Sequence, residues 1–219
     1  MSHARTHPVS AAIAAFQRGE PILVHDAADR EGETDLMYPA SAVDAAAVAH
    51  LRNDAGGLVC VALADEVAAT FDLPFVEDII SHPLANGHDL QYDTRSSFSL
   101  TVNHRETRTG ITDHDRAQTI AALAEAAHQP ASFPFAETFR SPGHVHLLRA
   151  APDLLAERVG HTELGIALAD AANLPPAVAL CEMLDDETGD ALSPRLARGY
   201  GERIGAPYVE GADIVSALR

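Results

Sequence analysis

The chain has 219 residues, of which 47% are hydrophobic and 5% aromatic, and it contains no Trp. This length suits one domain with a sizeable core, which Ala, Val, Leu and Ile must fill because aromatic side chains are scarce. The formal net charge of -17 excludes partners of the same sign, so neither nucleic acid nor an anionic membrane surface is expected to bind.

The basic residues are all Arg, because the sequence contains no Lys. A mechanism that needs a lysine Schiff base is therefore excluded. Two explanations of this composition stay open. Codon usage in a GC-rich genome accounts for the missing Lys but not for the acidic excess, whereas a halophile-like adaptation to a salt-rich cytoplasm accounts for the acidic excess.

The two cysteines, Cys60 and Cys181, each lie in an apolar run (GLVCVAL and AVALCEML). This setting predicts buried free thiols in a reducing compartment. No segment approaches the roughly 20 apolar residues of a membrane helix, and the first ten residues contain no apolar stretch. We expect a cytoplasmic protein.

The first half of the chain alternates short apolar strands with helices. The pattern predicts a helix over residues 9–18 ended by Gly19, a buried strand over 21–25 and a charged loop over 26–35. Ser41 is the expected N-cap of a helix that runs to about residue 54, where Gly56 and Gly57 end it. A strand follows over 58–63, and residues 74–95 show no period and predict a long irregular segment.

The second half continues the alternation. A half-buried strand is expected around residues 98–102, and Thr112, with Asp115 three residues later, predicts the start of a helix that ends near 128. Further strands are expected over 145–149 and 177–184, and further helices over 162–173, from Ser193-Pro194, and over 212–218. No repeat or linker interrupts the pattern. The prediction is one α+β domain over residues 1–219, with a mixed β-sheet packed by helices.

The charged loop after the first strand reads Asp29-Arg30-Glu31-Gly-Glu33-Thr-Asp35. In an extended backbone Glu31, Glu33 and Asp35 would share one face, so their carboxylates would converge and need a cation or a proton among them. Oxygen ligands favour Mg²⁺ or Mn²⁺, and Arg30 could clamp a phosphate. The alternative is a solvated acidic turn, and in a chain this acidic such runs of charge are common.

A second cluster combines histidines with a helix start. His144 and His146 alternate on one strand, and Arg158 precedes Gly160-His161-Thr162 at the beginning of a helix. Free N–H groups at a helix N-terminus bind phosphate, and His161 could reach back to a metal ion. The alternative is that Thr162 merely caps the helix and that the histidines gather by chance, since the chain has twelve.

The third candidate is Glu182, a carboxylate inside the apolar strand 177–184. A buried carboxylate must be paired, protonated or bound to metal, and a raised pKa would suit acid–base catalysis. Strand alternation also permits a position on the solvent face.

These residues together resemble the successive signatures of the 3,4-dihydroxy-2-butanone 4-phosphate synthase family. The resemblance spans about four fifths of the chain in the family's order, and the segment 102–105 resembles the archaeal branch most. It is carried by DREGETD at 29–35, TGIT at 109–112 with Asp115-Arg116, PGHV at 142–145, GHTE at 160–163 and LCE at 180–182.

The resemblance implies a lyase of riboflavin biosynthesis that converts ribulose 5-phosphate to 3,4-dihydroxy-2-butanone 4-phosphate and formate. It implies Mg²⁺ or Mn²⁺ and a homodimer with sites near the subunit interface. By the same resemblance Glu31 and His161 are metal ligands, and His144, Glu182, Asp35 and Glu33 serve catalysis. The implied substrate contacts are Arg30, Glu31, Asp35, Arg158, Val159, Gly160, His161, Thr162 and Glu182. Asp26 and Cys60 match positions near the site.

One departure from the family pattern is Val159, where many members have a smaller or polar residue, so a backbone contact there is open to change. Two rival functions are a different metal-dependent isomerase or aldolase acting on a pentose phosphate, and a non-catalytic binding protein of the same fold. Release of formate discriminates the first rival, and turnover with added Mg²⁺ discriminates the second.

Overall fold

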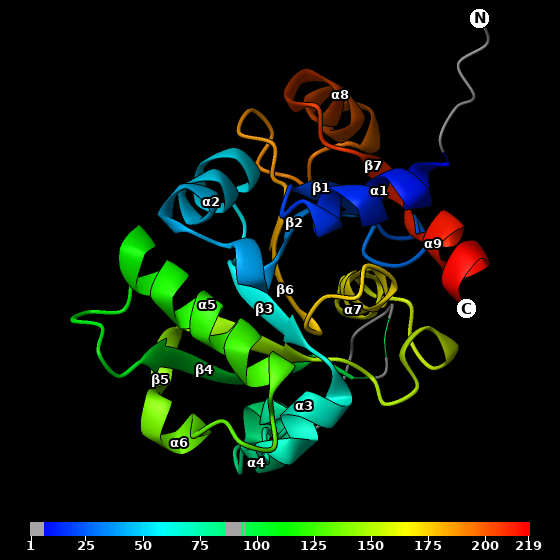
Figure 1. Ribbon diagram of the computed structural model, residues 1–219. Helices are drawn as coiled ribbons and strands as arrows, with labels where there is room; N and C mark the ends of the chain where they lie inside the picture. The colour runs from blue at the N-terminus through cyan, green and yellow to red at the C-terminus, as the bar shows by residue number, and fades with distance from the viewer. Residues whose placement is uncertain (1–6, 86–92, 94) are drawn as a thin grey trace, which may run out of the picture.

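The computed structural model describes residues 7–85, 93 and 95–219, and one seven-stranded sheet runs through this part of the chain (Figure 1). The strand order is β4-β5-β3-β6-β2-β1-β7. The β3–β5 and β1–β7 pairs are parallel and the other pairs are antiparallel. The sheet is therefore mixed, which confirms the predicted α+β class.

The strands are β1 (Ile22–His25), β2 (Thr34–Pro39), β3 (Cys60–Leu63), β4 (Phe98–His104), β5 (Phe139–Arg149), β6 (Ala177–Glu182) and β7 (Tyr208–Glu210). The α-helices are α1 (Pro8–Gln17), α2 (Ala45–His50), α3 (Asp65–Thr70), α4 (Val76–Ile79), α5 (Asp113–His128), α6 (Phe135–Thr138), α7 (His161–Ala171), α8 (Pro194–Ile204) and α9 (Gly211–Leu218). Shorter turns are η1 (Ala40–Ala42), the π-helix η2 (Leu51–Ala55), η3 (Pro83–Ala85) and η4 (Leu154–Ala156).

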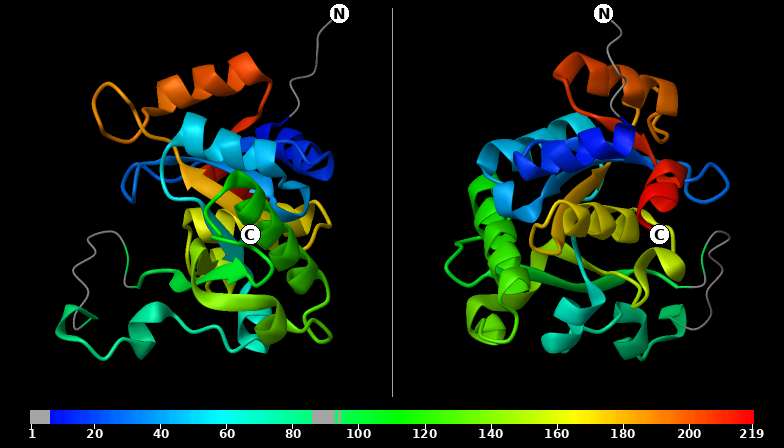
Figure 2. Two further views of the ribbon diagram at one scale, coloured as in Figure 1. Left: turned by 90° about the vertical axis from the view of Figure 1, so that its left-hand side faces the viewer. Right: turned by 45° about the vertical axis from the view of Figure 1, so that its right-hand side comes forward.

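Helices cover both faces of the sheet. On one face α7 packs against β2 and β6, where a Cβ atom at Gly165 would lie 3.4 Å from the side chains of Met37 and Val178. On the other face α8 packs against β1, where a Cβ atom at Gly201 would lie 3.4 Å from the side chain of Leu23. Figure 1 shows α7 and α5 on opposite sides of the sheet, and Figure 2 shows α8 and the α3–α4 region at opposite ends of the molecule. The start of α7 therefore lies beside the start of β2 and the end of β6.

Most predicted elements lie where the sequence placed them, with shifts of one or two residues at the ends. The predicted N-cap Ser41 is wrong: Ser41 lies in η1, and Asp44 caps α2 by accepting the Ala47 N–H at 2.8 Å. Thr112 caps α5 as predicted, accepting the Asp115 N–H at 3.1 Å. The predictions missed β2, β7 and the short helices α3, α4 and α6, and they made β5 too short. The irregular segment predicted over 74–95 lies partly outside the described residues.

The core is built mainly from aliphatic side chains, as the composition predicts. Leu, Ile, Val and Ala residues from both faces of the sheet dominate the buried set, with few aromatic members. Cys60 and Cys181 are buried free thiols, as expected. Among the described residues no helix has the length and hydrophobicity needed to cross a membrane.

Candidate active site

The loop between β1 and β2 folds around the buried carboxylate of Asp26. One oxygen, Oδ2, accepts the N–H of Glu31 at 3.2 Å and a bond from Arg30 at 3.1 Å, and the other, Oδ1, accepts the N–H of Glu33 at 3.1 Å. Gly32 adopts a left-handed conformation with φ of +69°. The backbone is therefore a turn, and the extended conformation expected for Glu31 to Asp35 is wrong before β2 begins. The carboxylates converge because Asp26 organises the turn.

A pocket of about 370 Å³ lies where this loop meets the N-terminus of α7. Eight of the eleven predicted site residues line it: Arg30, Glu31, Glu33, Asp35, Arg158, His161, Thr162 and Glu182. Its other walls are Cys60, Arg95, Ser96, Ser97, Phe98, Leu148 and Leu180. The two clusters that the sequence separates by more than 120 residues thus form one site.

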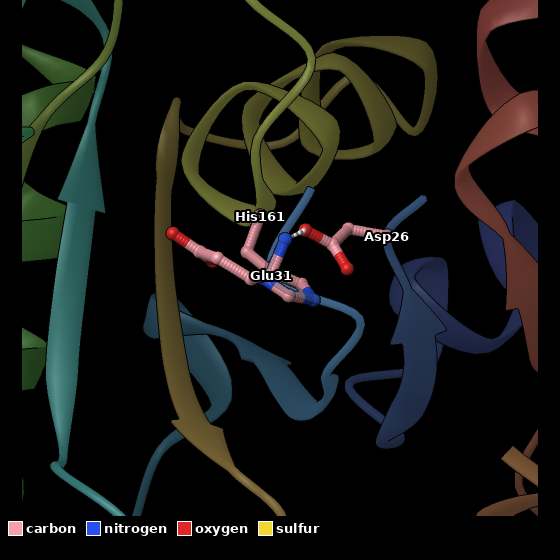
Figure 3. Close-up of side chains that lie close together, drawn as sticks. All are labelled: Asp26, Glu31 and His161. Carbon is pink, nitrogen blue, oxygen red and sulfur yellow. Dashed lines mark hydrogen bonds and ion pairs between the residues drawn. The ribbon is translucent and has the colours of Figure 1, made fainter. Parts of the chain in front are cut away.

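His161, the first residue of α7, lies among the carboxylates of the loop (Figure 3). Its Nδ1 is 3.3 Å from Oε2 of Glu31, and its Nε2 is 3.7 Å from Oδ1 of Asp35. Burial alone would lower the pKa of His161, but the carboxylates of Asp35, Glu31 and Asp26 outweigh it and raise the pKa to about 9. Without a metal ion, a proton on His161 balances the surrounding negative charge.

The three acidic side chains beside His161 differ in their preferred protonation state. Burial, reinforced by neighbouring carboxylates against the opposing charge of His161, raises the pKa of Asp35 to about 8. Burial and the negative charge of Glu31 and Glu182 also raise the pKa of Glu33. Burial acts the same way on Glu31, but its hydrogen bond to His161 and the charge of Arg30 lower its pKa overall. A site whose neighbouring carboxyl groups have pKa values shifted in opposite directions suits proton transfer.

The same residues fit a divalent cation. Ligand atoms of Asp26, Glu31 and His161 lie within 4.8 Å of one another, and Oδ1 of Asp35 is buried without a hydrogen-bond partner among the described residues. Three carboxylate residues and one imidazole form a donor set for a hard or borderline cation. Both oxygens of Asp26 already accept N–H bonds, which leaves Glu31 and His161 better placed to bind it.

Two arginines lie at the other side of the pocket and share one carboxylate. Oδ2 of Asp93 is 2.8 Å from Arg30 and 2.6 Å from Nε of Arg158. A Cβ atom on Gly160 would come within 2.4 Å of Arg158 and 2.9 Å of Arg30. The glycine therefore allows both guanidinium groups to pack over the backbone at the start of α7, where they hold an anion.

Glu163 holds Arg158 and the start of α7 in this arrangement. Its side chain is fully buried, pairs with Nη1 of Arg158 at 2.6 Å, and accepts the N–H groups of Ala151 at 2.9 Å and Gly160 at 3.2 Å. Gly160 is the N-cap of α7, so Thr162 is the second helical residue rather than its cap, and its buried side chain lines the pocket.

Glu182 ends β6 directly beside Asp35 of β2. Glu182 is half-buried and lines the pocket, so its position lies between the two predicted alternatives, full burial and the solvent face. Oε2 of Glu182 accepts the N–H of Leu58 at 2.7 Å. Cys60 lies on the neighbouring strand, and burial together with the charges of Glu182 and Asp35 raises the pKa of its thiol well above the usual value. A neutral thiol of this kind is a packing residue and a poor nucleophile.

Three predicted residues lie outside the pocket lining: His144, Val159 and Gly160. His144 is exposed, and its backbone N–H donates to Oδ1 of Asn103 at 2.8 Å. It does share the face of β5 with the pocket residue Leu148, because strand residues alternate. His146, between them, has a buried Nδ1 that no group in the described part of the chain hydrogen-bonds, and burial lowers the pKa of His146.

Sequence reasoning gave no site role to Asp93 or to the pocket wall formed by residues 95–98. Asp93 and Arg95 come from the irregular segment, which carries no motif, and Phe98 was predicted only as the start of a strand. Sequence reasoning also gave Glu163 no role. The one available signal was the position of Glu163 three residues after a glycine N-cap, where a carboxylate often folds back onto the helix terminus.

Comparison with known proteins agrees with this geometry. The sequence model of the 3,4-dihydroxy-2-butanone 4-phosphate synthase family matches residues 10–217. The family's enzyme from Archaeoglobus fulgidus is 48% identical, with 94% of this chain and 92% of the relative covered. The enzyme from Methanosarcina mazei is 45% identical, with 95% and 90% covered.

Solved structures of the family share the fold. The Candida albicans enzyme superposes with a TM-score of 0.79 at 33% identity, covering 97% of both chains. A further 3,4-dihydroxy-2-butanone 4-phosphate synthase, described as a complex with two magnesium ions, superposes with a TM-score of 0.82 at 28% identity, covering 96% of this chain and 95% of that one. Sequence, fold and pocket together place this chain in the 3,4-dihydroxy-2-butanone 4-phosphate synthase family.

Proposed function

We propose that this chain converts D-ribulose 5-phosphate to 3,4-dihydroxy-2-butanone 4-phosphate and formate, the activity for which its family is named, in riboflavin biosynthesis. The observation that carries the proposal is that one pocket has an anion-binding side and a side suited to cation binding and proton transfer. Arg30 and Arg158 hold an anion at one side, and carboxylates surround His161 at the other. The two products together contain all the atoms of the substrate, so the reaction needs no co-substrate.

The arginine side of the pocket is the proposed phosphate site. Both guanidinium groups contact the same oxygen of Asp93, Oδ2, which supports an anion-binding role for this side of the pocket. The first N–H groups of α7, at His161 and Thr162, have no partner within the helix and add positive potential. Val159 and Gly160 lie outside the pocket lining, and we propose that they act through the backbone at the start of α7.

We propose that Glu31 and His161 bind one divalent cation, Mg²⁺ or Mn²⁺, at the carboxylate side. When bound, the cation supplies Lewis-acid stabilisation of negative charge on the substrate's ketone and adjacent hydroxyl oxygens. His161 must give up a proton to bind it, because only neutral imidazole is a ligand. The excess of carboxylates around His161 favours this exchange of a proton for a cation.

Proton transfer falls to the remaining acidic side chains. The reaction removes a proton from C3 beside the ketone, expels the C1 hydroxyl group as water, shifts the carbon skeleton, and takes up a water when C4 leaves as formate. The pKa of Asp35 is raised to about 8, so this side chain can hold a proton near neutral pH and return it, and burial together with the charges of Glu31 and Glu182 raises the pKa of Glu33 in the same direction. Glu182, paired with Asp35 across β2 and β6, shares this work.

We further propose a homodimer in which a second subunit completes the site. His144 supports this, because it lies on the pocket face of β5 but outside the pocket formed by its own chain. In the assembled enzyme His144 carries protons or orients the substrate. Large apolar side chains beside the site, Leu58 at 38% exposure and Phe98 at 40%, fit a surface that a second chain covers.

The buried free thiols fit a cytoplasmic location.

Product analysis tests the proposed function. The purified chain with Mg²⁺ should release formate from ribulose 5-phosphate, and dephosphorylated ribulose should be a very poor substrate. A Glu182→Gln variant controls for contaminating activity, because it should keep the fold and lose turnover. Equal turnover of ribulose and its phosphate ester would contradict the phosphate site, and absence of formate would contradict the reaction.

A further inference from the structure

The ladder between β3 and β6 contains one extra residue at the point where Glu182 meets it. Cys60 pairs with Leu180, and the next bridge joins Gly56 to Met183. Three residues therefore lie between these pairs on the β3 side and only two on the β6 side. The backbone at Gly57-Leu58 is a β-bulge opposite Glu182, a feature that commonly re-aims a group next to an active site.

Consecutive N–H groups of this bulge hold Glu182 at two points. The N–H of Gly57 donates to the backbone carbonyl of Glu182 at 3.0 Å, and the N–H of Leu58 donates to its side-chain Oε2 at 2.7 Å. The second bond is short and has an ionisable acceptor, which makes it one of the stronger kinds of hydrogen bond. The other oxygen, Oε1, makes no hydrogen bond within the described part of the chain.

The absence of a side chain at Gly57 is part of the same arrangement. A Cβ atom there would lie 2.5 Å from Oε2 of Glu182 and 2.7 Å from its carbonyl oxygen. The carboxylate could swing away from such a contact, but the backbone of β6 could not. Any other residue at this position would displace the carboxylate and push the two strands apart.

We infer that the Gly57-Leu58 bulge is a positioning element that fixes the carboxylate of Glu182 against the pocket. The effect of this positioning on catalysis rests on the proposed function. A free glutamate at a strand end samples several rotamers, and a displacement of about 1 Å at a reacting group can reduce rate by about 100-fold. The bulge removes that freedom in two ways: position 57 has no side chain that would collide with Glu182, and position 58 presents the N–H that holds the carboxylate.

Replacing Leu58 by Pro removes the N–H, and Leu58→Ala is the matched control that retains it. The turnover number kcat of Leu58→Pro should lie about 10- to 100-fold below that of Leu58→Ala, the range for loss of a charged hydrogen bond. KM for ribulose 5-phosphate should differ less than about threefold between them, because the phosphate site is elsewhere. Equal kcat values would overturn the inference.

A spectroscopic measurement decides the case even if Leu58→Pro does not fold. In ¹⁵N-labelled wild-type protein the Leu58 amide proton should resonate downfield, and in Glu182→Gln it should move upfield while the amides of Val61 and Ala62 stay in place. An unmoved Leu58 amide would overturn the inference. Failure of the wild-type protein to release formate would contradict the proposed function instead, and the amide shift would still report the positioning contact.

Discussion

Removing Arg158 should weaken substrate binding and stability by two separable routes. In Arg158→Ala the phosphate loses a charged hydrogen bond, worth about 1.5–3 kcal/mol, so KM should rise about 10- to 100-fold. The variant also strips the counter-ion from Glu163, which is fully buried and pairs with Arg158 at 2.6 Å. Leaving a buried charge unpaired costs about 3–5 kcal/mol.

The stability loss should be near the lower end of that range, because Glu163 keeps the N–H groups of Ala151 and Gly160. For a chain of this size 1 kcal/mol shifts Tm by about 2–4 °C, so about 3 kcal/mol predicts a fall of roughly 6–12 °C. Calorimetry measures Tm and steady-state kinetics measures KM on the same preparations.

The double variant Arg158→Ala/Glu163→Gln separates the routes. A neutral amide in place of the buried carboxylate should restore most of the lost Tm, whereas KM should stay as high as in the single variant. Recovery of KM together with Tm would refute the reasoning, since it would show that Arg158 acts by holding Glu163 and the start of α7 rather than by binding phosphate.

Three further predictions concern the cation and the charge. Glu31→Gln and His161→Ala should each lose most activity and the rise in Tm that Mg²⁺ causes, while the metal-free fold persists; a normal Mg²⁺ response in both would remove them from the ligand set. The pKa of His161 is raised from 6.5 to about 9, so its contribution to metal-free stability is complete below pH 6.5 and disappears as pH rises through 9. Because the cation replaces that proton, the gain in Tm from Mg²⁺ should grow between pH 6.5 and 9, and a pH-independent gain would contradict this. At a formal charge of -17 the protein repels its anionic substrate, and its own charges repel one another. In molar salt the Debye length falls to about 3 Å, so a KCl series should raise Tm and lower KM. A flat or falling Tm with a worsening KM would show that the acidic excess is not an adaptation to salt.

The sequence was more informative about which residues belong to the site than about the backbone that brings them together. Glu31 and His161 could be named as ligands through the family resemblance, whereas residue types alone indicated only that the loop carboxylates and a helix-terminal histidine were candidates. The cause of their convergence could not: an extended backbone was expected, and the carboxylate of Asp26 instead folds the loop through its N–H groups. A residue that acts on the backbone leaves no pattern in a single sequence.

Elements were missed where the local pattern is weak. Strand β2 is buried at every position, yet it begins with Thr34 and Asp35, so it neither alternates nor forms a wholly apolar run. Strand β7 has only three residues and is defined by its parallel partner β1. The bulge at Gly57-Leu58 is a property of the pairing with β6, which no local window contains.

The most direct test of the central claim is the fate of one carbon atom. Ribulose 5-phosphate labelled with ¹³C at C4 should yield ¹³C-formate and an unlabelled four-carbon phosphate when the chain acts on it with Mg²⁺, and chelator should abolish both products. An isomerase would keep the label in a five-carbon product, and an aldolase would place it in a sugar fragment. Either outcome, or formate formed at the same rate in excess chelator, would contradict the account.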